Sequence, residues 1–247
     1  MNTVLSDQRR LNCTFYVKND EFYVNLGTSI KINSSLYHYA GNNPVRYVDP
    51  DGREIIISKQ LLTINSSGNR PGTNLIELKS VVMHWTQVPG QTAQQTRNFF
   101  GLASTETSAH YVVGQEGEVI QMIPDKEVAY HAGGTGKALT DFANKTYTTS
   151  NGKVRPNLFT IGIEVNPSKS DGSQTKEAYN SSAKLAAKVL KDNGLDNSFG
   201  ILFGDNLVRH GDITGKECPK KFMNNSFSWF AFKMKVCFEL LKINAGE

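Results

Sequence analysis

Short runs of apolar and β-branched residues alternate along the chain with segments whose apolar positions recur at helical spacing. The runs typical of strands are residues 80–86, 110–113, 118–123, 159–165 and 206–213. The helical pattern is present in residues 92–102, 176–192 and 226–241. Because strands and helices alternate around one set of apolar runs, the pattern predicts an α/β fold with a mixed central β-sheet flanked by helices.

Details of the pattern predict how these elements connect and which residues they bury. Residues 114–117, Gly-Gln-Glu-Gly, predict a hairpin between two strands, and Asn193-Gly194 predicts the end of the second helix. The side chains expected to face the core are Phe99, Phe100 and Leu102 in the first helix, Ala183, Ala186, Ala187 and Leu190 in the second, and Trp229, Phe232, Val236 and Leu240 in the third. Cys237 belongs to the same stripe as the last four.

Residues 1–54 differ in character from the rest of the chain. Two short β-type pieces, residues 13–17 and 21–26, are separated by Asn, Asp and Gly, and turn-forming pairs follow at Asn43-Pro44 and Asp51-Gly52. The sequence therefore predicts a turn-rich N-terminal appendage over residues 1–54 and a second, larger domain over residues 55–247. At 247 residues the chain is long enough for both.

Composition narrows the environment in which the protein works. The 27 Lys and Arg against 23 Asp and Glu give a net charge of +4, which favours an anionic partner such as a cell wall without singling one out. We expect no nucleic-acid partner. The first ten residues lack the apolar core of a signal peptide, and no run reaches the roughly 20 apolar residues of a membrane helix. Three scattered cysteines do not make a disulfide framework. We therefore expect synthesis in the cytoplasm without a signal peptide, and no membrane insertion.

One stretch near the C-terminus combines residue types that suit metal chemistry. Residues 208–219 hold His210, Lys216 and Cys218, and their two glycines let the loop fold back so that the imidazole and the thiolate can reach one Zn²⁺. A third ligand is available at the end of the strand over residues 80–86, where alternation places Val82, His84 and Thr86 on one side. Taken singly, each residue also fits a loop histidine, a buried thiol or a core histidine.

The segments around these residues resemble one family in order and spacing. They are Val82-Met83-His84-Trp85-Thr86, Ser108-Ala109-His110-Tyr111, Glu127-Val128-Ala129-Tyr130-His131-Ala132-Gly133, Thr160-Ile161-Gly162-Ile163-Glu164 and residues 208–219. The family is the zinc-dependent N-acetylmuramoyl-L-alanine amidases of type 2, which includes phage lysins and peptidoglycan recognition proteins. The resemblance implies that His84, His210 and Cys218 bind zinc. It also implies hydrolysis of the amide between N-acetylmuramic acid and L-alanine in peptidoglycan or muropeptides. Three protein ligands leave a position for water, whose pKa zinc lowers from about 15.7 to about 7.

The resemblance also implies roles for other residues. Glu164 is the expected general acid and base, and it shares a strand face with Gly162, whose missing side chain is expected to leave room for substrate. Some relatives use a tyrosine beside the strand histidine instead, but that position is Ala109 here. Lys216 is expected to stabilise the oxyanion. His131 is expected to bind substrate at the cleft edge, Thr86 to orient a ligand or line the cleft, and His110 to pack behind the site or in the core. A surface glutamate and an exposed loop lysine are the structural alternatives for Glu164 and Lys216.

A second resemblance concerns the appendage. Residues 36–53, from Leu36-Tyr37-His38-Tyr39 to Asp51-Gly52-Arg53, resemble the closing motif of RHS/YD-repeat proteins, where a repeat shell ends and a variable effector begins. This resemblance implies a toxin delivered to another cell's wall, with an immunity protein as partner. The alternatives are a phage lysin released by a separate membrane-permeabilising protein, and a turn-rich leader that has no role of its own. Two further alternatives for the catalytic domain stay open, a non-catalytic peptidoglycan-binding module and a cysteine peptidase using Cys218.

Overall fold

The structure is a computed structural model, which describes residues 14–18, 21–25, 29–35, 55–65, 68–102, 104–133 and 139–246. The chain divides into two compact units, Met1–Gly52 and Arg53–Glu247. The motif that resembles RHS/YD-repeat proteins, residues 36–53, lies outside the described residues.

The N-terminal unit contains one small antiparallel sheet. Its strands are β1 (Thr14–Lys18), β2 (Glu21–Asn25) and β3 (Ser29–Ser35), in the order β1-β2-β3. Tyr16 lies opposite Tyr23 in the first pair, and the second pair is irregular between Glu21 and Tyr23. The two predicted strands are present. The third was not predicted, because only two apolar residues alternate within the polar segment Ser-Ile-Lys-Ile-Asn-Ser-Ser.

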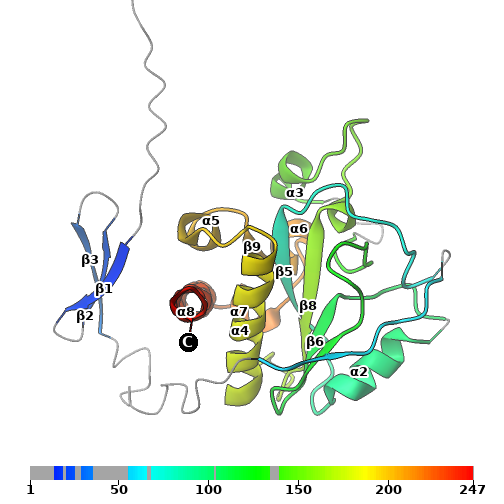
Figure 1. Ribbon diagram of the computed structural model, residues 1–247, viewed down its shortest axis with the longest axis horizontal. Helices are drawn as coiled ribbons and strands as arrows, with labels where there is room; N and C mark the ends of the chain where they lie inside the picture. Colours follow the sequence, from blue (N-terminus) through cyan, green and yellow to red (C-terminus); the bar gives the residue numbers. More distant parts are fainter. Residues whose placement is uncertain are drawn as a thin grey trace, which may run out of the picture. The chain divides into compact units, whose positions relative to one another are not determined.

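The larger unit is built on a six-stranded mixed sheet (Figure 1). The strand order is β4-β7-β6-β8-β5-β9, with bounds β4 (Ile57–Lys59), β5 (Ser80–Trp85), β6 (Tyr111–Val113), β7 (Val119–Gln121), β8 (Thr160–Val165) and β9 (Leu207–Arg209). Strands β6 and β7 form the predicted antiparallel hairpin, and the other neighbours are parallel. The expected α/β class with a mixed sheet and flanking helices is confirmed.

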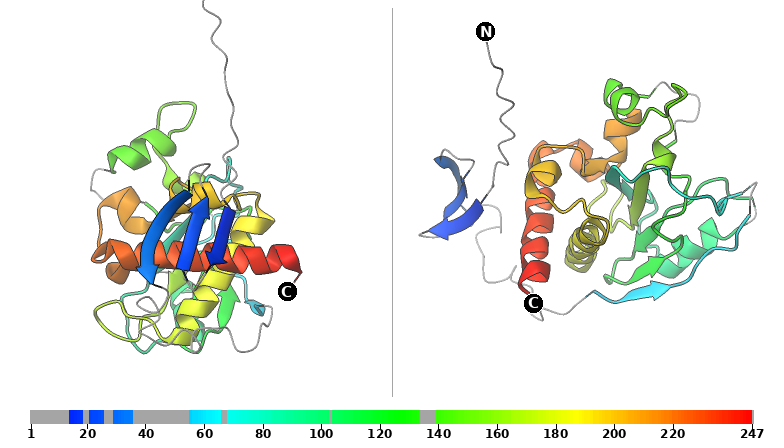
Figure 2. Two further views of the ribbon diagram at one scale, coloured as in Figure 1. Left: turned by 90° about the vertical axis from the view of Figure 1, so that its left-hand side faces the viewer. Right: turned by 45° about the horizontal axis from the view of Figure 1, so that its top comes forward.

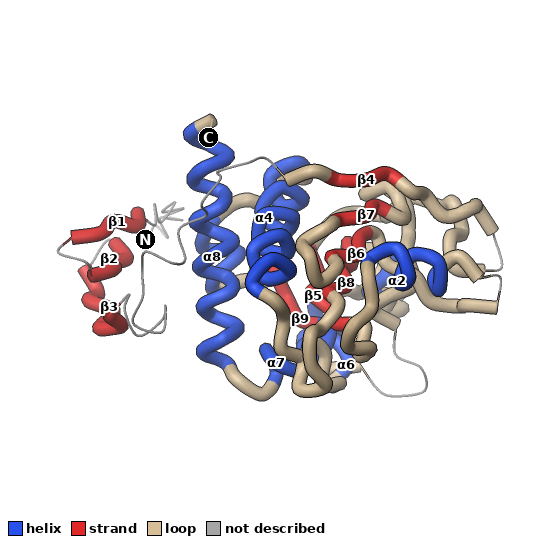
Figure 3. Tube along the Cα trace, turned by 90° about the horizontal axis from the view of Figure 1, so that it is seen from below, coloured by secondary structure: helices blue, strands red, loops and turns tan. Residues whose placement is uncertain are grey.

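Two long helices form layers on one side of this sheet. Helix α4 (Lys176–Asp192) contacts β5, β6 and β8, and it buries the predicted alanine and leucine stripe. Helix α8 (Ser226–Ala245) packs on the outer side of α4, as Figures 2 and 3 show. The four apolar residues predicted to face the core from this last helix are all buried. The α8 helix extends four residues beyond its predicted end at residue 241.

The other face of the sheet, which includes His84, is covered by a second layer of apolar residues. Val82 and Val208 on this face pack with Ala132, Ala143, Tyr147, Phe159 and Ile213. These residues come from the segment after His131, from α3 (Asp141–Thr146) and its C-cap, from the position before β8, and from α6 (His210–Thr214). The Tyr147 and Ser80 hydroxyls lie 2.7 Å apart and join this layer to the start of β5.

Two predictions about the elements are wrong. Helix α2 (Ala93–Phe100) has Thr92 as its N-cap and buries Phe100, but Phe99 and Leu102 are each 52% exposed. The buried positions Ala93, Thr96 and Phe100 form one stripe, from which Phe99 points away, and the helix ends before Leu102. The strand expected over residues 206–213 stops at Arg209, because a new helix, α6, starts at His210.

Besides α6, four short helical elements in the described part of the chain were not predicted. They are α3, η2 (Pro156–Leu158), α5 (Ser198–Leu202) and α7 (Lys220–Met223). Each has six residues or fewer, which is too short for a helical apolar stripe to be recognised. Among the helices that the structure describes, none combines the length and apolar character needed to cross a bilayer.

Candidate metal centre

Three buried side chains from neighbouring segments meet at one edge of the sheet. His84 is the fifth residue of β5, His210 follows directly after the adjacent strand β9, and Cys218 lies in the loop before α7. Their candidate ligand atoms all lie within 4.8 Å of one another. The His84 Nδ1 atom is 3.9 Å from the Cys218 Sγ atom, and the two imidazole rings are centred 4.5 Å apart. The structure thus brings together the three residues expected to bind zinc.

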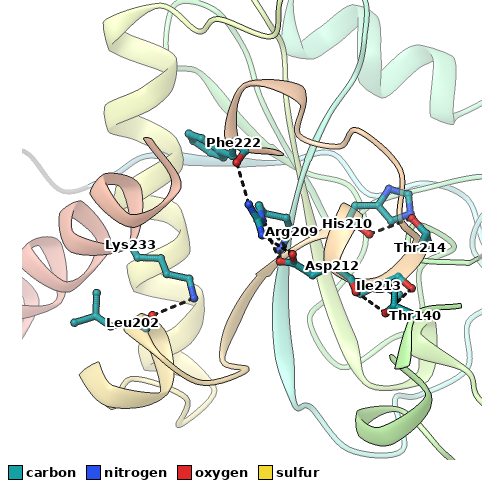
Figure 4. A network of polar contacts seen from close by, with 9 residues as sticks. All are labelled: Thr140, Leu202, Arg209, His210, Asp212, Ile213, Thr214, Phe222 and Lys233. Atoms are coloured by element: carbon teal, nitrogen blue, oxygen red, sulfur yellow. Dashed lines mark hydrogen bonds and ion pairs between the residues drawn. The ribbon is translucent and has the colours of Figure 1, made fainter. Parts of the chain in front are cut away.

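Helix α6 orients His210 through polar contacts at its first turn (Figure 4). The Arg209 backbone N–H and guanidinium both donate to the Asp212 carboxylate, at 2.8 and 2.6 Å. Arg209 also donates to the Phe222 carbonyl in α7, and the Thr140 hydroxyl donates to the Asp212 carbonyl. These bonds hold α6 against both α7 and the segment before α3. They fix the direction in which His210 leaves β9.

The loop that carries Cys218 folds back onto the start of α6, so that Cys218 lies near His210. The Gly211 N–H donates to the Cys218 carbonyl at 2.7 Å. A Cβ atom at Gly211 would lie 2.4 Å from both the Lys216 carbonyl oxygen and the Met223 Sδ atom, so a larger residue would push the loop open. The predicted folding back of this loop therefore depends on glycine for space.

The protonation states of these groups fit a soft divalent cation. Burial lowers the pKa of His84 well below its usual value, and the nearby charges of His210, His131 and Lys216 lower it further. Burial, followed by the charge of Lys216, lowers the pKa of His210 to about 4. Both imidazoles are therefore neutral at pH 7, which is the form that binds metal. Burial and the Glu164 charge raise the pKa of the Cys218 thiol, and a bound cation would deprotonate it.

The donor set and its spacing also fit zinc. The His210 Nε2 atom is buried, and no described residue hydrogen-bonds to it. A tetrahedral zinc site with Zn–N near 2.0 Å and Zn–S near 2.3 Å places nitrogen and sulfur about 3.5 Å apart. The observed 3.9 Å between His84 Nδ1 and Cys218 Sγ needs only a small adjustment. Two imidazoles and one thiolate are ligands that zinc commonly takes.

Glu164 lies beside this cluster on the neighbouring strand. In the parallel register of β5 and β8 it is directly opposite His84, and its Oε1 atom is 3.9 Å from His84 Nδ1. Its Oε2 atom is buried without a hydrogen-bond partner among the described residues. Burial raises the pKa of Glu164 to about 8. A cation in the site would favour the carboxylate and lower this pKa, so Glu164 could both accept and donate a proton there.

Gly162 does not leave the space that we expected for substrate. A Cβ atom at this position would lie 2.5 Å from the His131 Cγ atom, so the His131 ring occupies the site of the missing side chain. His131 is buried rather than at a cleft edge. Its ring nitrogens face the His84 Nε2 atom at 3.0 Å and the Thr160 carbonyl at 3.2 Å. These contacts direct His131 at a predicted ligand instead of at the substrate.

His110 packs in the core, as the sequence indicated. Its Nδ1 atom accepts from the Gly162 N–H at 3.0 Å, and its Nε2 atom donates to the Glu127 carbonyl at 2.9 Å. Asn157 was missed by sequence reasoning, although its Oδ1 atom accepts from the His131 and Ala132 N–H groups. Only a Pro-Asn turn marks its position in the sequence.

Lys216 and Thr86 lie close to the cluster. Lys216 is half-buried and lies two residues before Cys218 in the sequence, and its positive charge is one of the causes that lower the pKa of His84 and the pKa of His210. Thr86 follows β5 on the same side as His84, and its N–H donates to the Val165 carbonyl. Its Oγ1 atom is buried and receives no hydrogen bond from the described part of the chain. Both groups are therefore available to a bound molecule.

Residues 74–221 match the model of one protein family, described as N-acetylmuramoyl-L-alanine amidase. The chain belongs to this family. It is 34% identical over 172 residues to a probable N-acetylmuramoyl-L-alanine amidase of Bacillus licheniformis, covering 68% of this chain and 44% of that protein. It is 35% identical over 168 residues to the amidase BlyA of Bacillus subtilis (strain 168), covering 68% and 43%. The chain therefore matches less than half the length of each of these two relatives.

Solved structures of lower identity share the amidase fold. The solution structure of the PlyG catalytic domain aligns with a TM-score of 0.57 at 22% identity, covering 75% of this chain and 96% of that one. Staphylococcus aureus hydrolase AmiA, solved in complex with its ligand, aligns with a TM-score of 0.57 at 16% identity, covering 87% and 94%. The expected architecture of the larger unit is thus found in known structures.

Proposed function

We propose that this protein is a zinc-dependent N-acetylmuramoyl-L-alanine amidase that cleaves the bond between N-acetylmuramic acid and L-alanine in peptidoglycan. The observation that carries the proposal is the meeting of His84, His210 and Cys218 within 4.8 Å, with Glu164 directly opposite His84. Relatives at 34% and 35% identity are named as amidases of this bond. A wall polymer or a soluble muropeptide would both present the bond.

The residues around the cluster supply the steps that an amide hydrolase requires. Zinc held by the three ligands would polarise the carbonyl and activate water as a nucleophile. Glu164 accepts the proton of the attacking water and returns it to the leaving amine of L-alanine. Lys216 stabilises the negative charge that develops on the carbonyl oxygen. The Thr86 hydroxyl orients a ligand or the substrate at the same face of β5.

The metal and the reaction are tested together on single variants. The wild-type protein is expected to bind one Zn²⁺ and to lose its activity when a chelator removes the metal. Its digestion of purified sacculi should produce new amine and sugar ends, which mass spectrometry identifies. Cys218→Ala should lose zinc, whereas Cys218→Asp should keep more, because a carboxylate oxygen also binds zinc. Glu164→Gln should keep zinc while turnover falls by about 100- to 10,000-fold. Full zinc in the alanine variants of all three ligands would refute the ligand set.

The alternatives predict different results. A cysteine peptidase would keep its activity in the chelator, and its nucleophile would need a lowered thiol pKa, whereas burial raises the pKa of Cys218. A non-catalytic peptidoglycan-binding module would bind sacculi and release no new ends. The site favours catalysis, since it presents an unpartnered carboxylate oxygen of Glu164 beside the three metal-binding side chains.

We further propose that residues 1–54 are a leader left from an RHS-type repeat shell, and that residues 55–247 are a toxin directed at another cell's wall. The motif at residues 36–53 supports the proposal, as does the position of every candidate site residue within Arg53–Glu247. An immunity protein would be the matching partner. A chain starting at residue 55 should digest sacculi at the full-length rate and lyse a Gram-negative host only when it is directed to the periplasm. Loss of folding on truncation would contradict this organisation.

A further inference from the structure

We infer that His131 is a positioning residue, which holds His84 in the one tautomer that can bind the metal through Nδ1. The inference rests on the proposed zinc centre and concerns a residue behind it. His131 Nδ1 lies 3.0 Å from His84 Nε2, and His131 Nε2 lies 3.2 Å from the Thr160 carbonyl oxygen. Both histidines are buried, at 8% and 2% exposure.

The positions of the hydrogens follow from the end of this chain of contacts. A carbonyl oxygen only accepts, so His131 Nε2 carries the hydrogen that it donates to Thr160. The His131 ring is buried, and the partners that its nitrogens contact among the described residues are His84 and Thr160, neither of which is a carboxylate, so its Nδ1 atom keeps a lone pair and accepts. His84 Nε2 must then be the donor. The lone pair of His84 is left on Nδ1, the atom that lies 3.9 Å from the Cys218 sulfur.

Three neighbours fix the His131 ring in this orientation. The ring fills the space that Gly162 leaves on β8, where a Cβ atom would lie 2.5 Å from Cγ. The Asn157 side chain accepts from the His131 backbone N–H at 3.2 Å. The Thr160 hydroxyl donates to the Pro156 carbonyl at 2.9 Å, so its oxygen can accept from His131 Nε2, which lies 3.2 Å away. The ring can therefore neither flip nor turn without losing these contacts.

This arrangement gives His131 a measurable effect on metal binding. A metal-binding histidine usually donates its second N–H to a carboxylate, a carbonyl or water, and loss of that partner weakens metal affinity by about 10- to 100-fold. Here a neutral imidazole acts as the acceptor, and Thr160 fixes that imidazole in turn. Removing the acceptor leaves a buried N–H of His84 unpaired and frees the ring to take the other tautomer.

The test compares His131→Ala with His131→Asn and with a matched control, His110→Asn. In asparagine, Oδ1 stands at the position of Nδ1, so His131→Asn keeps an acceptor for His84. His110 is also a buried histidine; its ring lies 5.6 Å from the His131 ring, but its printed ring hydrogen bonds go to Glu127 and Gly162, and His110→Asn keeps an acceptor for the Gly162 N–H. Zinc affinity is measured by competition with a chelating dye. The His84 tautomer is read from long-range ¹H–¹⁵N NMR spectra of the metal-free protein.

We expect metal-free wild-type protein to show His84 protonated at Nε2. We expect zinc affinity to fall about 10- to 100-fold in His131→Ala, to recover largely in His131→Asn, and to stay near the wild-type value in His110→Asn. Wild-type His84 protonated at Nδ1 would overturn the inference, as would unchanged affinity in His131→Ala, or an equal loss in His110→Asn. If His131→Ala does not fold, the wild-type tautomer and the His131→Asn affinity still decide. Wild-type protein that binds no zinc would instead refute the metal centre itself.

Discussion

Replacing Gly162 with alanine is the smallest change that should disturb the metal centre from behind. Gly162 lies in β8 between His110 and His131. Its N–H donates to the ring nitrogen Nδ1 of His110, and its carbonyl accepts from the backbone N–H of His110. A Cβ atom there would lie 2.5, 2.6 and 2.9 Å from the Cγ, Nδ1 and Cδ2 atoms of His131. Carbon atoms in ordinary contact are about 3.5–4.0 Å apart, so the ring must move by roughly 1 Å.

The loss of stability and of zinc affinity follows from the contacts that this movement of the ring would break. His131 is 3.0 Å from His84 Nε2, and a shift of about 1 Å takes this distance out of hydrogen-bond range. Overpacking costs about 1–3 kcal/mol, and the lost hydrogen bond adds about 1 kcal/mol. Alanine restricts the unfolded chain and returns about 0.4–1 kcal/mol. We expect Gly162→Ala to lower the free energy of unfolding by about 1–4 kcal/mol, and zinc affinity to fall about 10- to 100-fold.

Urea unfolding of the metal-free protein measures the stability, and competition with a chelating dye measures the affinity. Gly133→Ala is the matched control, because it lies two residues after His131 and, among the described residues, a Cβ atom there would meet Asn157 Nδ2 alone, at an ordinary contact distance of 3.5 Å. We expect that control to stay within about 0.5 kcal/mol of the wild type. A Gly162→Ala protein with wild-type stability and zinc affinity would show that the His131 ring moves freely, which would refute the reasoning.

Two further predictions concern stability and pH. Burial lowers the pKa of Lys233 to about 8, whereas its value in the unfolded chain is near 10.4. Between these pH values Lys233 is protonated in the unfolded chain and neutral in the folded one, so the stability of the wild type should rise as the pH is raised from about 8 to about 10.4. Lys233→Met should stabilise the protein at pH 7 by about 1–3 kcal/mol and abolish that rise; an equal rise in both proteins, measured by urea midpoints at pH 7 and 10, would contradict this. The hydrogen bonds from Arg70 hold the pKa of Glu127 below its usual value, so the ionised carboxylate stabilises the folded state. That stabilisation is fully present above pH of about 4.5, and it is lost as the pH falls through the lowered pKa. Glu127→Gln should therefore be less stable than wild type at pH 7, and the difference should shrink towards pH of about 3 in acid titration.

The sequence predicts best those elements whose pattern is long and has a clear end. The α4 helix, 17 residues long, has the predicted bounds, because its buried stripe continues from Ala178 to Leu190 and a glycine with φ of 72° follows its C-cap. Strand alternation was enough to place Val82 with His84 and Gly162 with Glu164, and the parallel pairing of β5 with β8 then puts both pairs on the same side of the sheet. Local periodicity thus predicts which residues can face the site.

Contacts between distant segments explain most of what the sequence did not predict. Residues 206–213 have the apolar character of a strand, but Asp212 accepts from the Arg209 N–H and starts a helix at His210. The space beside Gly162 looks open in the sequence, because nothing there shows that the segment carrying His131 crosses β8 at that point. Both features depend on side chains that approach from elsewhere in the fold, and neither has a periodic pattern.

The arrangement of the strands brings three of the site's side chains together at the ends of neighbouring strands. Strands β8, β5 and β9 are neighbours and run parallel, so their carboxyl ends meet at one edge of the sheet. Glu164 and His84 are the fifth residues of six-residue strands in register, and His210 directly follows the third strand. Backbone pairing therefore sets the separation of these three groups before any ion binds. Cys218 alone reaches the site through a loop, and the bond from the Gly211 N–H to its carbonyl places it there. Zinc would then find its nitrogen ligands in place and would have to order only the thiolate.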